Sequence, residues 1–468
     1  MKIKTAIKIT LSLVLITLLL QRAYSQAVQK PNIVVIMTDQ QFADAMSCVM
    51  GEQYIHTPNM DKLAEKGIRF THAYSPNPLC MPMRTSMMTG RFPHETGVLT
   101  NDDEDISPSD FVFLGKLFKD AGYETGYFGK WHVAFDEKQK KIHGFDNPIA
   151  KGSQLDAEPA ATFLKQKHEK PFLVVASFLS PHEVCQWSRK QNLPGGPISE
   201  MPQLEDLPPL KTNFFPPENE TDIMAFMRKS YQANLRLFPV GDYTDADWRR
   251  LQWGYYRLIE RADAFVGTVM DALKESGQEK NTLVVFLSDH GDCAGSHHWN
   301  QKTVFYDESA RVPFIMKWDG KTIKGTSDVL LNTGTDMIPT LCDFAGIEIP
   351  KGLPGKSLKA TATGKAPEWK REYVVTENHM VQCEPVDGRN YKPQGRMVRS
   401  SRYKYCIYSE GNDRESLGDM DSDPLEMVNQ AANPVYKKIL EQHRKYLKEH
   451  ANQTNDAMAL KMLNDLNN

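Results

Sequence analysis

The sequence lacks a cysteine framework of either common kind. Its seven cysteines are scattered through 468 residues and show no zinc-finger spacing. They are also too sparse for a small disulfide-stapled scaffold. We therefore expect most of them to be small, buried apolar side chains. They stand at positions 48, 80, 185, 293, 342, 383 and 406.

The chain also lacks a strong charge of one sign and tracts of low complexity. Its formal net charge is -3, which gives no global attraction to polyanions, so nucleic acid is not an expected partner. The 28 prolines and 29 glycines are spread along the chain, and no internal repeat is evident. With 40% hydrophobic residues, this composition is typical of a globular protein with a large core.

The N-terminal hydrophobic run is too short to span a membrane. Three lysines precede an apolar stretch over residues 9–20, and Ala23 and Ser25 then form a small-x-small cleavage site. A spanning helix needs ~20 apolar residues. The pattern predicts a signal peptide over residues 1–25 that is cleaved after Ser25. It implies export to the periplasm or secretion, with no stable membrane anchor.

Four short apolar runs have the length and composition of buried strands, and each ends in a polar cluster. The runs cover residues 33–37, 125–129, 172–179 and 282–287. Ligands gather beyond the carboxyl ends of strands in open α/β sheets, so four such clusters predict one shared site. The clusters are Thr38-Asp39-Gln40, Lys130-Trp131-His132, Ser180-Pro181-His182 and Ser288-Asp289-His290.

Helical patterns fall between these runs, at residues 59–67, 111–122 and 248–277. Strands that alternate with helices indicate an α/β domain with a large mixed, mostly parallel central sheet flanked by helices. The proline-rich segment between His182 and Thr221 is predicted to lack regular structure through most of its length. We expect this segment to rim the site.

A smaller unit is expected at the C-terminus. After Leu353-Pro354-Gly355 the pattern changes to short alternating stretches at 373–376 and 403–408, and a helix follows over about 434–451. This predicts an α+β subdomain with antiparallel strands. We therefore place a catalytic domain at residues 26–355 and the C-terminal subdomain at residues 356–468.

Cys80 stands where the first turn of a helix is expected, because Pro82 suits that turn. The N-terminus of a helix favours an anion, and Arg84, one turn further on, adds a positive charge. Such surroundings lower the pKa of a thiol, so a reactive cysteine is one interpretation.

The same segment, LCMPMRTSMMTGR, resembles the signature of the type I (formylglycine-dependent) sulfatases, Cys-x-Pro-x-Arg followed five residues later by Thr-Gly. Met83 stands where that family usually has Ser or Ala, so which maturation system accepts it stays open. The stretches PNIVVIMTDQQ, GYETGYFGKWH, SDHGDCAGSHHWNQK and LGDMDSDPLEMVN extend the resemblance over nearly the whole mature chain. It implies an alkaline-phosphatase-like fold and a sulfuric ester hydrolase.

In that family the cysteine is converted to formylglycine by a maturation enzyme, and the hydrated aldehyde is the nucleophile. The resemblance therefore implies that Cys80 is modified in this way. A gem-diol avoids a slow attack by water at sulfur, because one hydroxyl displaces the alcohol and the other then expels sulfate.

The resemblance also implies a metal site. Asp39, Gln40, Asp289 and His290, with an oxygen of the modified Cys80, should hold one divalent cation. Oxygen-rich ligands suit a hard cation, and we expect Ca²⁺. Many family members have Asp in place of Gln40 and Asn in place of His290, so the identity of the metal stays open.

Catalytic roles are carried over by motif. Lys130 and Lys302 would grip the sulfate oxygens and offset the charge that develops in the transition state. His182 would protonate the leaving oxygen, and His132 would contact the diol and assist its collapse. Arg84 would orient the diol.

The expected substrate is a sulfated glycan, such as a glycosaminoglycan, mucin or algal polysaccharide, because the chain is expected to be exported and to have long rim loops. Choline sulfate and small aryl sulfates stay open. Weaker candidates for substrate contacts come from the C-terminal subdomain, and most of them could equally be solvated charges. These are Glu377, His379, Arg396 and Arg399.

Two other readings compete. A phosphonate monoester or phosphodiester hydrolase of the same superfamily can use a similar nucleophile and metal set, so the pocket must decide between the two activities. A secreted binding protein that has lost catalysis is disfavoured, because all six of its expected catalytic positions are retained. They are Cys80, Arg84, Lys130, His132, Asp289 and Lys302.

Overall fold

The computed structural model describes residues 30–103, 110–146 and 153–466. The signal peptide predicted for residues 1–25 lies outside them. Within the described ranges, no helix combines the length and apolar character that a membrane span requires.

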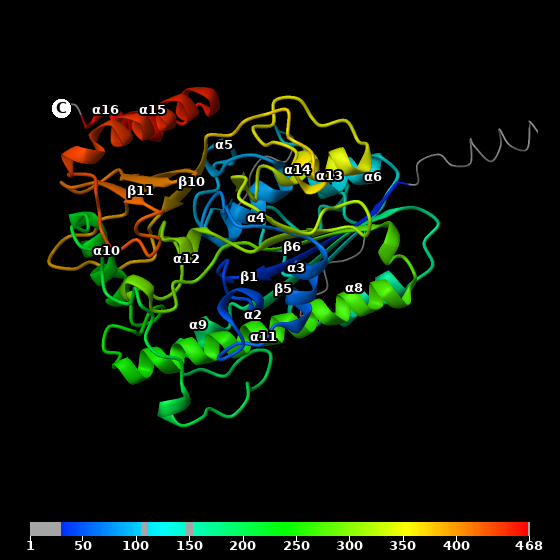
Figure 1. Cartoon of the computed structure of the whole chain (residues 1–468), viewed down its shortest axis with the longest axis horizontal. Coiled ribbons are helices and arrows are strands. Elements are labelled where there is room, and N and C mark those ends of the chain that lie inside the picture. Colours follow the sequence, from blue (N-terminus) through cyan, green and yellow to red (C-terminus); the bar gives the residue numbers. More distant parts are fainter. Residues whose placement is uncertain (1–29, 104–109, 147–152, 467–468) are drawn as a thin grey trace, which may run out of the picture.

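A seven-stranded mixed sheet forms the centre of the larger part of the molecule, with strand order β4-β5-β1-β6-β7-β2-β8 (Figure 1). The first four strands are parallel, β7 is antiparallel to both of its neighbours, and β2 and β8 are parallel. The prediction of a large, mostly parallel sheet is therefore confirmed. The strands are β4 (Glu124–Gly129), β5 (Phe172–Pro181), β1 (Asn32–Asp39), β6 (Thr282–Ser288), β7 (Phe314–Lys317), β2 (Ile68–Phe70) and β8 (Gly325–Ser327).

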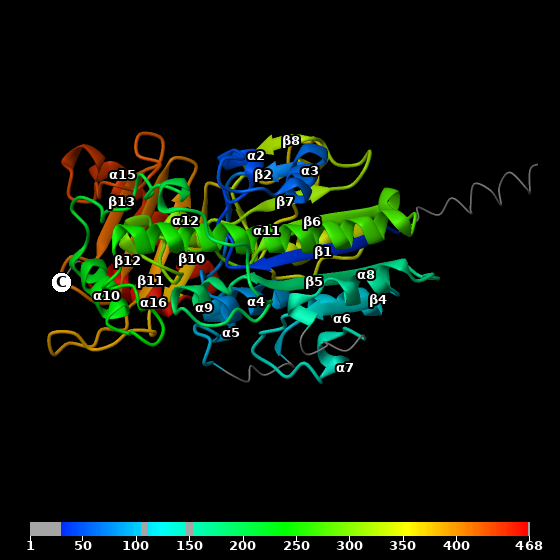
Figure 2. The same ribbon diagram turned by 90° about the horizontal axis from the view of Figure 1, so that it is seen from below.

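Helices cover both faces of this sheet (Figures 1 and 2). Side chains of β1 alternate between the two resulting cores, with Val34 and Ile36 on one face and Ile33 and Val35 on the other. One core lies beneath α3 (Pro58–Lys66), α8 (Glu158–Lys165) and the long α11 (Asp245–Glu275). The other lies beneath α4 (Cys80–Thr89), α6 (Leu114–Asp120), α13 (Met337–Ala345) and α14 (Lys359–Ala362).

The register of the parallel strands brings their carboxyl ends to one edge. Thr38 of β1 pairs with Ser288 of β6, and Gly129 of β4 pairs with Ser177 of β5. The polar residues that follow the four strands are consequently neighbours in space, as in other open α/β sheets.

Gly129 shows how closely two of these strands meet. Its φ is 108°, and an added Cβ would lie 1.8 Å from the carbonyl oxygen of Ser177. Only glycine tolerates both conditions. The close approach lets the backbone N–H of Lys130 donate to the same oxygen at 2.8 Å, which fixes Lys130 just beyond the strand end.

An antiparallel sheet with strand order β10-β11-β12-β13 forms the smaller part, at one end of the large sheet (Figure 1). One of its faces packs on α15 and α16, and the other packs on α10 (Asp222–Gln232) and on residues of the larger part such as Phe305. This confirms the predicted antiparallel C-terminal unit. Its elements are β10 (Tyr373–His379), β11 (Gln394–Ser400), β12 (Tyr403–Tyr408), β13 (Glu415–Asp419), α15 (Lys437–Thr454) and α16 (Ala457–Asn464).

Short elements complete the chain. The segment after His182 contains only α9 and one 3-10 turn (Leu204–Asp206) before α10 begins. The boundary predicted at residue 355 stays a prediction, although Leu358 and Ala362 pack in a core of the large sheet. The short elements are α2 (Ser47–Met50), β3 (Ala73–Tyr74), α5 (Pro93–Thr96), α7 (Lys140–His143), α9 (Val184–Ser188), α10 (Asp222–Gln232), α12 (Asp307–Ala310) and β9 (Leu331–Asn332).

Candidate active site

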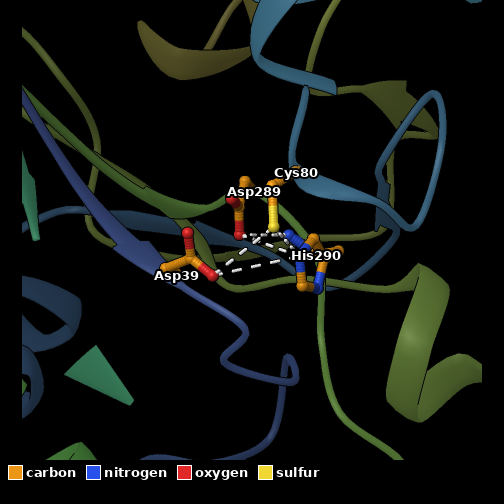
Figure 3. A group of neighbouring side chains, drawn as sticks. All are labelled: Asp39, Cys80, Asp289 and His290. Carbon is orange, nitrogen blue, oxygen red and sulfur yellow. Dashed lines mark hydrogen bonds and ion pairs between the residues drawn. The ribbon is translucent and has the colours of Figure 1, made fainter. Parts of the chain in front are cut away.

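Cys80 lies at the first position of α4, in a fully buried setting at the edge where the strands end (Figure 3). Its Sγ is 3.1 Å from Nε2 of His290, 3.1 Å from Nζ of Lys302 and 3.8 Å from Oδ1 of Asp39. Burial opposes ionisation of the thiol, but Lys130, Lys302 and His290 outweigh it and hold the Cys80 pKa well below its usual value. The site therefore favours an anion at this position.

Arg84 lies one turn further along α4, where it is fully buried and donates four hydrogen bonds. Its Nη2 donates to Oδ2 of Asp39 and its Nε to Oδ2 of Asp289, both at 2.9 Å. Its Nη1 donates to the carbonyl oxygen of Lys130 at 2.9 Å and to Oγ of Ser177 at 2.8 Å. The planar guanidinium thus connects the ends of β1, β4, β5 and β6 in one network.

Two buried carboxylates face Cys80 and differ in their electrostatics. Burial by itself would raise the pKa of Asp39, but the net effect of Lys130, His182 and Arg84 lowers it. Burial and the nearby Asp39 raise the pKa of Asp289. Oδ1 of Asp289 also accepts two backbone N–H groups, that of Gln40 at 3.0 Å and that of His290 at 2.9 Å.

Two lysines add positive charge from opposite sides of the sheet edge. Nζ of Lys130 lies 2.5 Å from Oδ2 of Asp39, and Nζ of Lys302 lies 2.8 Å from Oε1 of Gln40. Lys302 is only 4% exposed, so its charge is weakly screened by solvent. We call Asp39, Cys80, Arg84, Lys130, Asp289, His290 and Lys302 the strand-end site.

The donor set of this site fits a divalent cation. Asp39, Cys80, Asp289 and His290 each offer one ligand atom, and these atoms all lie within 4.8 Å of one another (Figure 3). Nδ1 of His290 lies 2.9 Å from the carbonyl oxygen of Gly291, so Nδ1 carries a proton, and Nε2, which contacts Cys80, is the ring atom that can bind a metal. Two carboxylates, an imidazole and a fourth group suit a hard or borderline cation.

Gln40 joins the same edge directly after β1, in the left-handed region with φ 74°. A non-glycine residue rarely adopts this conformation. Its backbone is held at both ends, because its N–H donates to Asp289 and its carbonyl oxygen accepts from Tyr255 Oη at 2.6 Å. Its side-chain oxygen faces Lys302.

His132 and His182 follow β4 and β5, and both lie beside the side chain of Cys80. The Nδ1 atom of each is buried and has no partner among the described residues. Burial, assisted by Lys130 and Lys302, lowers the pKa of His182 to about 4. The structure therefore brings the predicted catalytic and metal-binding residues together around Cys80, whereas Trp131 of the same clusters packs in a core of the large sheet.

The four weaker candidates lie elsewhere in the C-terminal sheet. Glu377 is fully buried and accepts from Nδ1 of His94 at 2.6 Å, while Arg396 donates to both carboxylate oxygens of Asp456 at 2.6 and 3.0 Å. We call His94, Glu377, Arg396 and Asp456 the junction cluster, because it connects α5, the small sheet and the start of α16.

The other two weaker candidates, Arg399 and His379, also lie on the small sheet. Nε of Arg399 donates to Tyr74 Oη at 2.9 Å, and His379 is half-buried at the end of β10. Contacts of these four residues with substrate stay predictions.

Sequence reasoning missed three residues that support the strand-end site. Asp292 accepts from the side chain of Gln40, Ser177 accepts from Arg84, and Nδ2 of Asn378 donates to the carbonyl oxygen of Thr303 at 2.6 Å. Asp292 alone had a signal, since it closes the Ser-Asp-His-Gly-Asp stretch. Ser177 and Asn378 lie within strands, where nothing in the pattern marks them.

Comparisons with known proteins agree with this geometry. The family model described as Sulfatase matches residues 31–347, and the one described as N-sulphoglucosamine sulphohydrolase, C-terminal, matches residues 295–453. The chain is 33% identical over 451 residues to a Delta 4,5-hexuronate-2-O-sulfatase from Bacteroides thetaiotaomicron, covering 93% of this chain and 91% of that protein.

Two further relatives are similar over most of their length. An ulvan-active sulfatase from Formosa agariphila is 30% identical over 448 residues, covering 88% of this chain and 79% of that protein. A solved structure of a 2-O GAG sulfatase aligns with a TM-score of 0.80 at 30% identity, covering 92% of this chain and 93% of that one.

Proposed function

This chain belongs to the sulfatase family and is a sulfuric ester hydrolase, and from that premise we propose that it removes a sulfate ester from a sulfated glycan through a formylglycine made from Cys80. The observation that carries the proposal is the position of Cys80, buried at a helix N-terminus and within 3.1 Å of both His290 and Lys302.

The charge of the strand-end site suits a sulfate ester. Arg84, Lys130 and Lys302 carry three positive charges, whereas Asp39 and Asp289 carry two negative ones. The imbalance is buried, where electrostatic interactions are strong. A monoanionic ester beside position 80 would offset part of this positive charge.

We propose that Asp39, Gln40, Asp289 and His290 hold one divalent cation, with Ca²⁺ as the first candidate. The support is the convergence of three of these side chains with Cys80, and the direction of His290 Nε2 toward Cys80. When present, the cation and the formylglycine together supply a Lewis acid and a hydrated aldehyde nucleophile. Arg84 keeps both carboxylates in place, because it binds the oxygens that face away from this centre.

The remaining roles belong to side chains that surround Cys80. We propose that Lys130 and Lys302 bind the sulfate oxygens and stabilise the charge of the transition state. His182 would donate the proton to the leaving oxygen, and His132 would exchange a proton with the nucleophile. Burial and the two lysines lower the pKa of His182. An anionic ester between the lysines would offset their charge and raise this pKa, and a general acid needs the higher pKa in order to carry a proton.

For the substrate, we propose a glycosaminoglycan-type saccharide with a 2-O-sulfated hexuronate as the first candidate. The support is the 33% identity to a Delta 4,5-hexuronate-2-O-sulfatase over 93% of this chain.

The test is release of inorganic sulfate by the mature protein after co-expression with a formylglycine-generating enzyme. The panel contains a 2-O-sulfated unsaturated hexuronate disaccharide, 6-O- and N-sulfated glucosamine, an aryl sulfate, choline sulfate, and a phosphonate monoester. Protein expressed without the maturation enzyme provides the blank. We expect sulfate release to be fastest from the 2-O-sulfated disaccharide.

Other outcomes would change the proposal in defined ways. Faster release from another sulfated saccharide would reject the 2-O assignment and keep the glycan class. Turnover of the small sulfates alone would reject the glycan class. Turnover of the phosphonate ester without sulfate release would reject the proposed chemistry.

We also propose that the chain is exported to the periplasm or secreted after cleavage behind Ser25. The support is the sequence of the N-terminal residues, where three lysines precede an apolar stretch and a small-x-small site. N-terminal sequencing of the protein recovered from the extracytoplasmic fraction should begin at Gln26. Recovery of a chain that retains residues 1–25 would contradict cleavage.

A further inference from the structure

Asp292 is buried behind the strand-end site and is 1% exposed. Its Oδ2 accepts from Nε2 of Gln40 at 2.6 Å, and its Oδ1 accepts the backbone N–H groups of Ala294 at 2.7 Å and Gln301 at 3.1 Å. One carboxylate therefore contacts the residue after β1 and both ends of the loop that leads to Lys302.

The amide of Gln40 has two possible orientations, and its neighbours allow only one. Its Oε1 lies 2.8 Å from Nζ of Lys302, a group that can only donate. Its Nε2 lies 2.6 Å from the Asp292 carboxylate, a group that, when ionised, can only accept. Rotating the amide by half a turn would place two donors together on one side and two acceptors together on the other.

The backbone of Gln40 is held in place and fixes where its side chain begins. Its N–H donates to Asp289, its carbonyl oxygen accepts from Tyr255, and its φ of 74° is rarely adopted by a side-chain-bearing residue. The amide is therefore presented from a fixed position, and the flanking groups alone decide whether oxygen or nitrogen faces the strand-end site.

We propose that Asp292 is the positioning residue that selects Gln40 Oε1 as a metal-facing oxygen, while its second oxygen holds the loop that carries Lys302. This inference rests on the proposed metal site. An amide oxygen can bind a hard cation, whereas an amide nitrogen cannot. Partners behind metal ligands commonly change metal affinity by about 10- to 100-fold.

The substitution Asp292→Asn separates the two roles. Asparagine keeps one oxygen for the N–H groups of Ala294 and Gln301, but it presents an NH₂ group to Gln40. The Gln40 amide must then face a donor on both sides. In a chain that also carries Gln40→Glu, the NH₂ group of the asparagine at position 292 faces a carboxylate at position 40. The hydrogen bond between the two positions is then restored, with the donor at 292 and the acceptor at 40.

The experiment is calorimetric titration of four matured proteins with Ca²⁺, and with Mg²⁺ and Mn²⁺ in parallel: the parent, Asp292→Asn, Gln40→Glu and the double variant. We expect Asp292→Asn to weaken binding about 10- to 100-fold in the parent background. In the Gln40→Glu background we expect the same change to strengthen binding, because it removes a contact between two carboxylates.

The sign of the Asp292→Asn effect in the two backgrounds decides the inference. An equal loss in both would show that Asp292 acts only through the loop or through folding, and would overturn the inference while leaving the metal site intact. A parent protein that binds none of the three ions would instead reject the metal site, and the inference with it. Unfolding midpoints of the metal-free proteins check that all four are folded.

Discussion

Two buried clusters of charged side chains in this protein contain similar residue types but differ in their net charge. The strand-end site sets three cationic side chains, Arg84, Lys130 and Lys302, against two carboxylates. The junction cluster contains two cations and two carboxylates, and each of these four groups forms an ion pair with another of them. Once Cys80 is converted to formylglycine, the first has a surplus of positive charge, whereas the second is neutral.

The junction cluster reaches this balance through the protonation of one histidine. Nδ1 of His94 faces the Glu377 carboxylate, and its Nε2 lies 3.1 Å from the carbonyl oxygen of Thr454. Both neighbours are acceptors, so both ring nitrogens carry protons. Burial lowers the pKa of His94, but Glu377 and Asp456 outweigh it and raise the value to about 9.

The difference shows how function can be separated from structural support among buried charges. A buried cluster that pairs every charge depends on each of its members, because loss of one leaves its partner buried and unpaired, whereas a cluster with a surplus is ready for a ligand of the opposite sign. Removing a cation should therefore impair activity in the first cluster and stability in the second.

The largest effect is expected at Cys80, compared with a second buried cysteine. The thiol pKa of Cys80 is lowered, whereas burial raises that of Cys406 in β12 to about 12. Replacement of the nucleophile commonly costs about 10⁴-fold or more in turnover. We expect Cys80→Ala to lose sulfate release to that extent, and Cys406→Ala to retain the parent rate per folded molecule. Equal rates for Cys80→Ala and the parent would reject the nucleophile.

In the junction cluster, Arg396→Met should act on stability. It leaves Asp456 and Glu377 buried without their cation, which typically costs about 3 to 5 kcal/mol. The matched control is Arg402→Met, because Arg402 is half-exposed in its pair with Asp419 and its loss should change the unfolding free energy far less.

Urea unfolding gives both free energies, and the rate per folded molecule should be unchanged in either variant. A rise in KM for Arg396→Met without loss of stability would instead support the predicted contact of Arg396 with substrate.

In the strand-end site, Lys302→Met should act on turnover. Loss of one preorganised cation costs about 10²- to 10³-fold in kcat. Stability should stay within about 1 kcal/mol, because the change removes surplus charge. Lys404 provides the contrast, since it is equally buried but lies between Asp307 at 2.5 Å and Glu426 at 2.7 Å.

We expect Lys404→Met to lower the unfolding free energy and to leave kcat of the folded fraction unchanged. The reverse pattern in the two lysine variants would contradict the division between the clusters.

The smallest effect concerns the pH dependence of the junction cluster. The folded pKa of His94, about 9, lies above the ordinary value of 6.5, so its stabilisation is present at low pH and is lost as the pH rises through 9. Between pH 7 and pH 10 the parent should lose about 2 to 3 kcal/mol of unfolding free energy more than His94→Gln does. Parallel curves for the two proteins would show that His94 is not charged in the fold.

The parallel strands that carry the site could be predicted because they are buried on both faces and read as continuous apolar runs. Strand β11 was missed for the opposite reason. Its sequence, QGRMVRS, contains Arg396 and Arg399, which look like solvated charges. Their partners Asp456 and Tyr74 lie 60 and 325 positions away, so no local pattern reveals that these arginines are buried.

The same limit applies to the site. Motif spacing could identify Asp39, Cys80 and Asp289, because each follows a strand or begins a helix. The role of Asp292 depends on a hydrogen bond to Gln40, 252 positions away, and only the folded chain brings the two together.

The central claim is that hydrolysis depends on formylglycine at position 80 within a cation-rich site. The most direct test uses preparations matured to different extents by varying the amount of the maturation enzyme. Mass spectrometry of the tryptic peptide 70–84 gives the fraction converted, and sulfate release gives the rate. The account predicts a rate proportional to that fraction that falls to zero without conversion. A substantial rate from fully unconverted protein would contradict it.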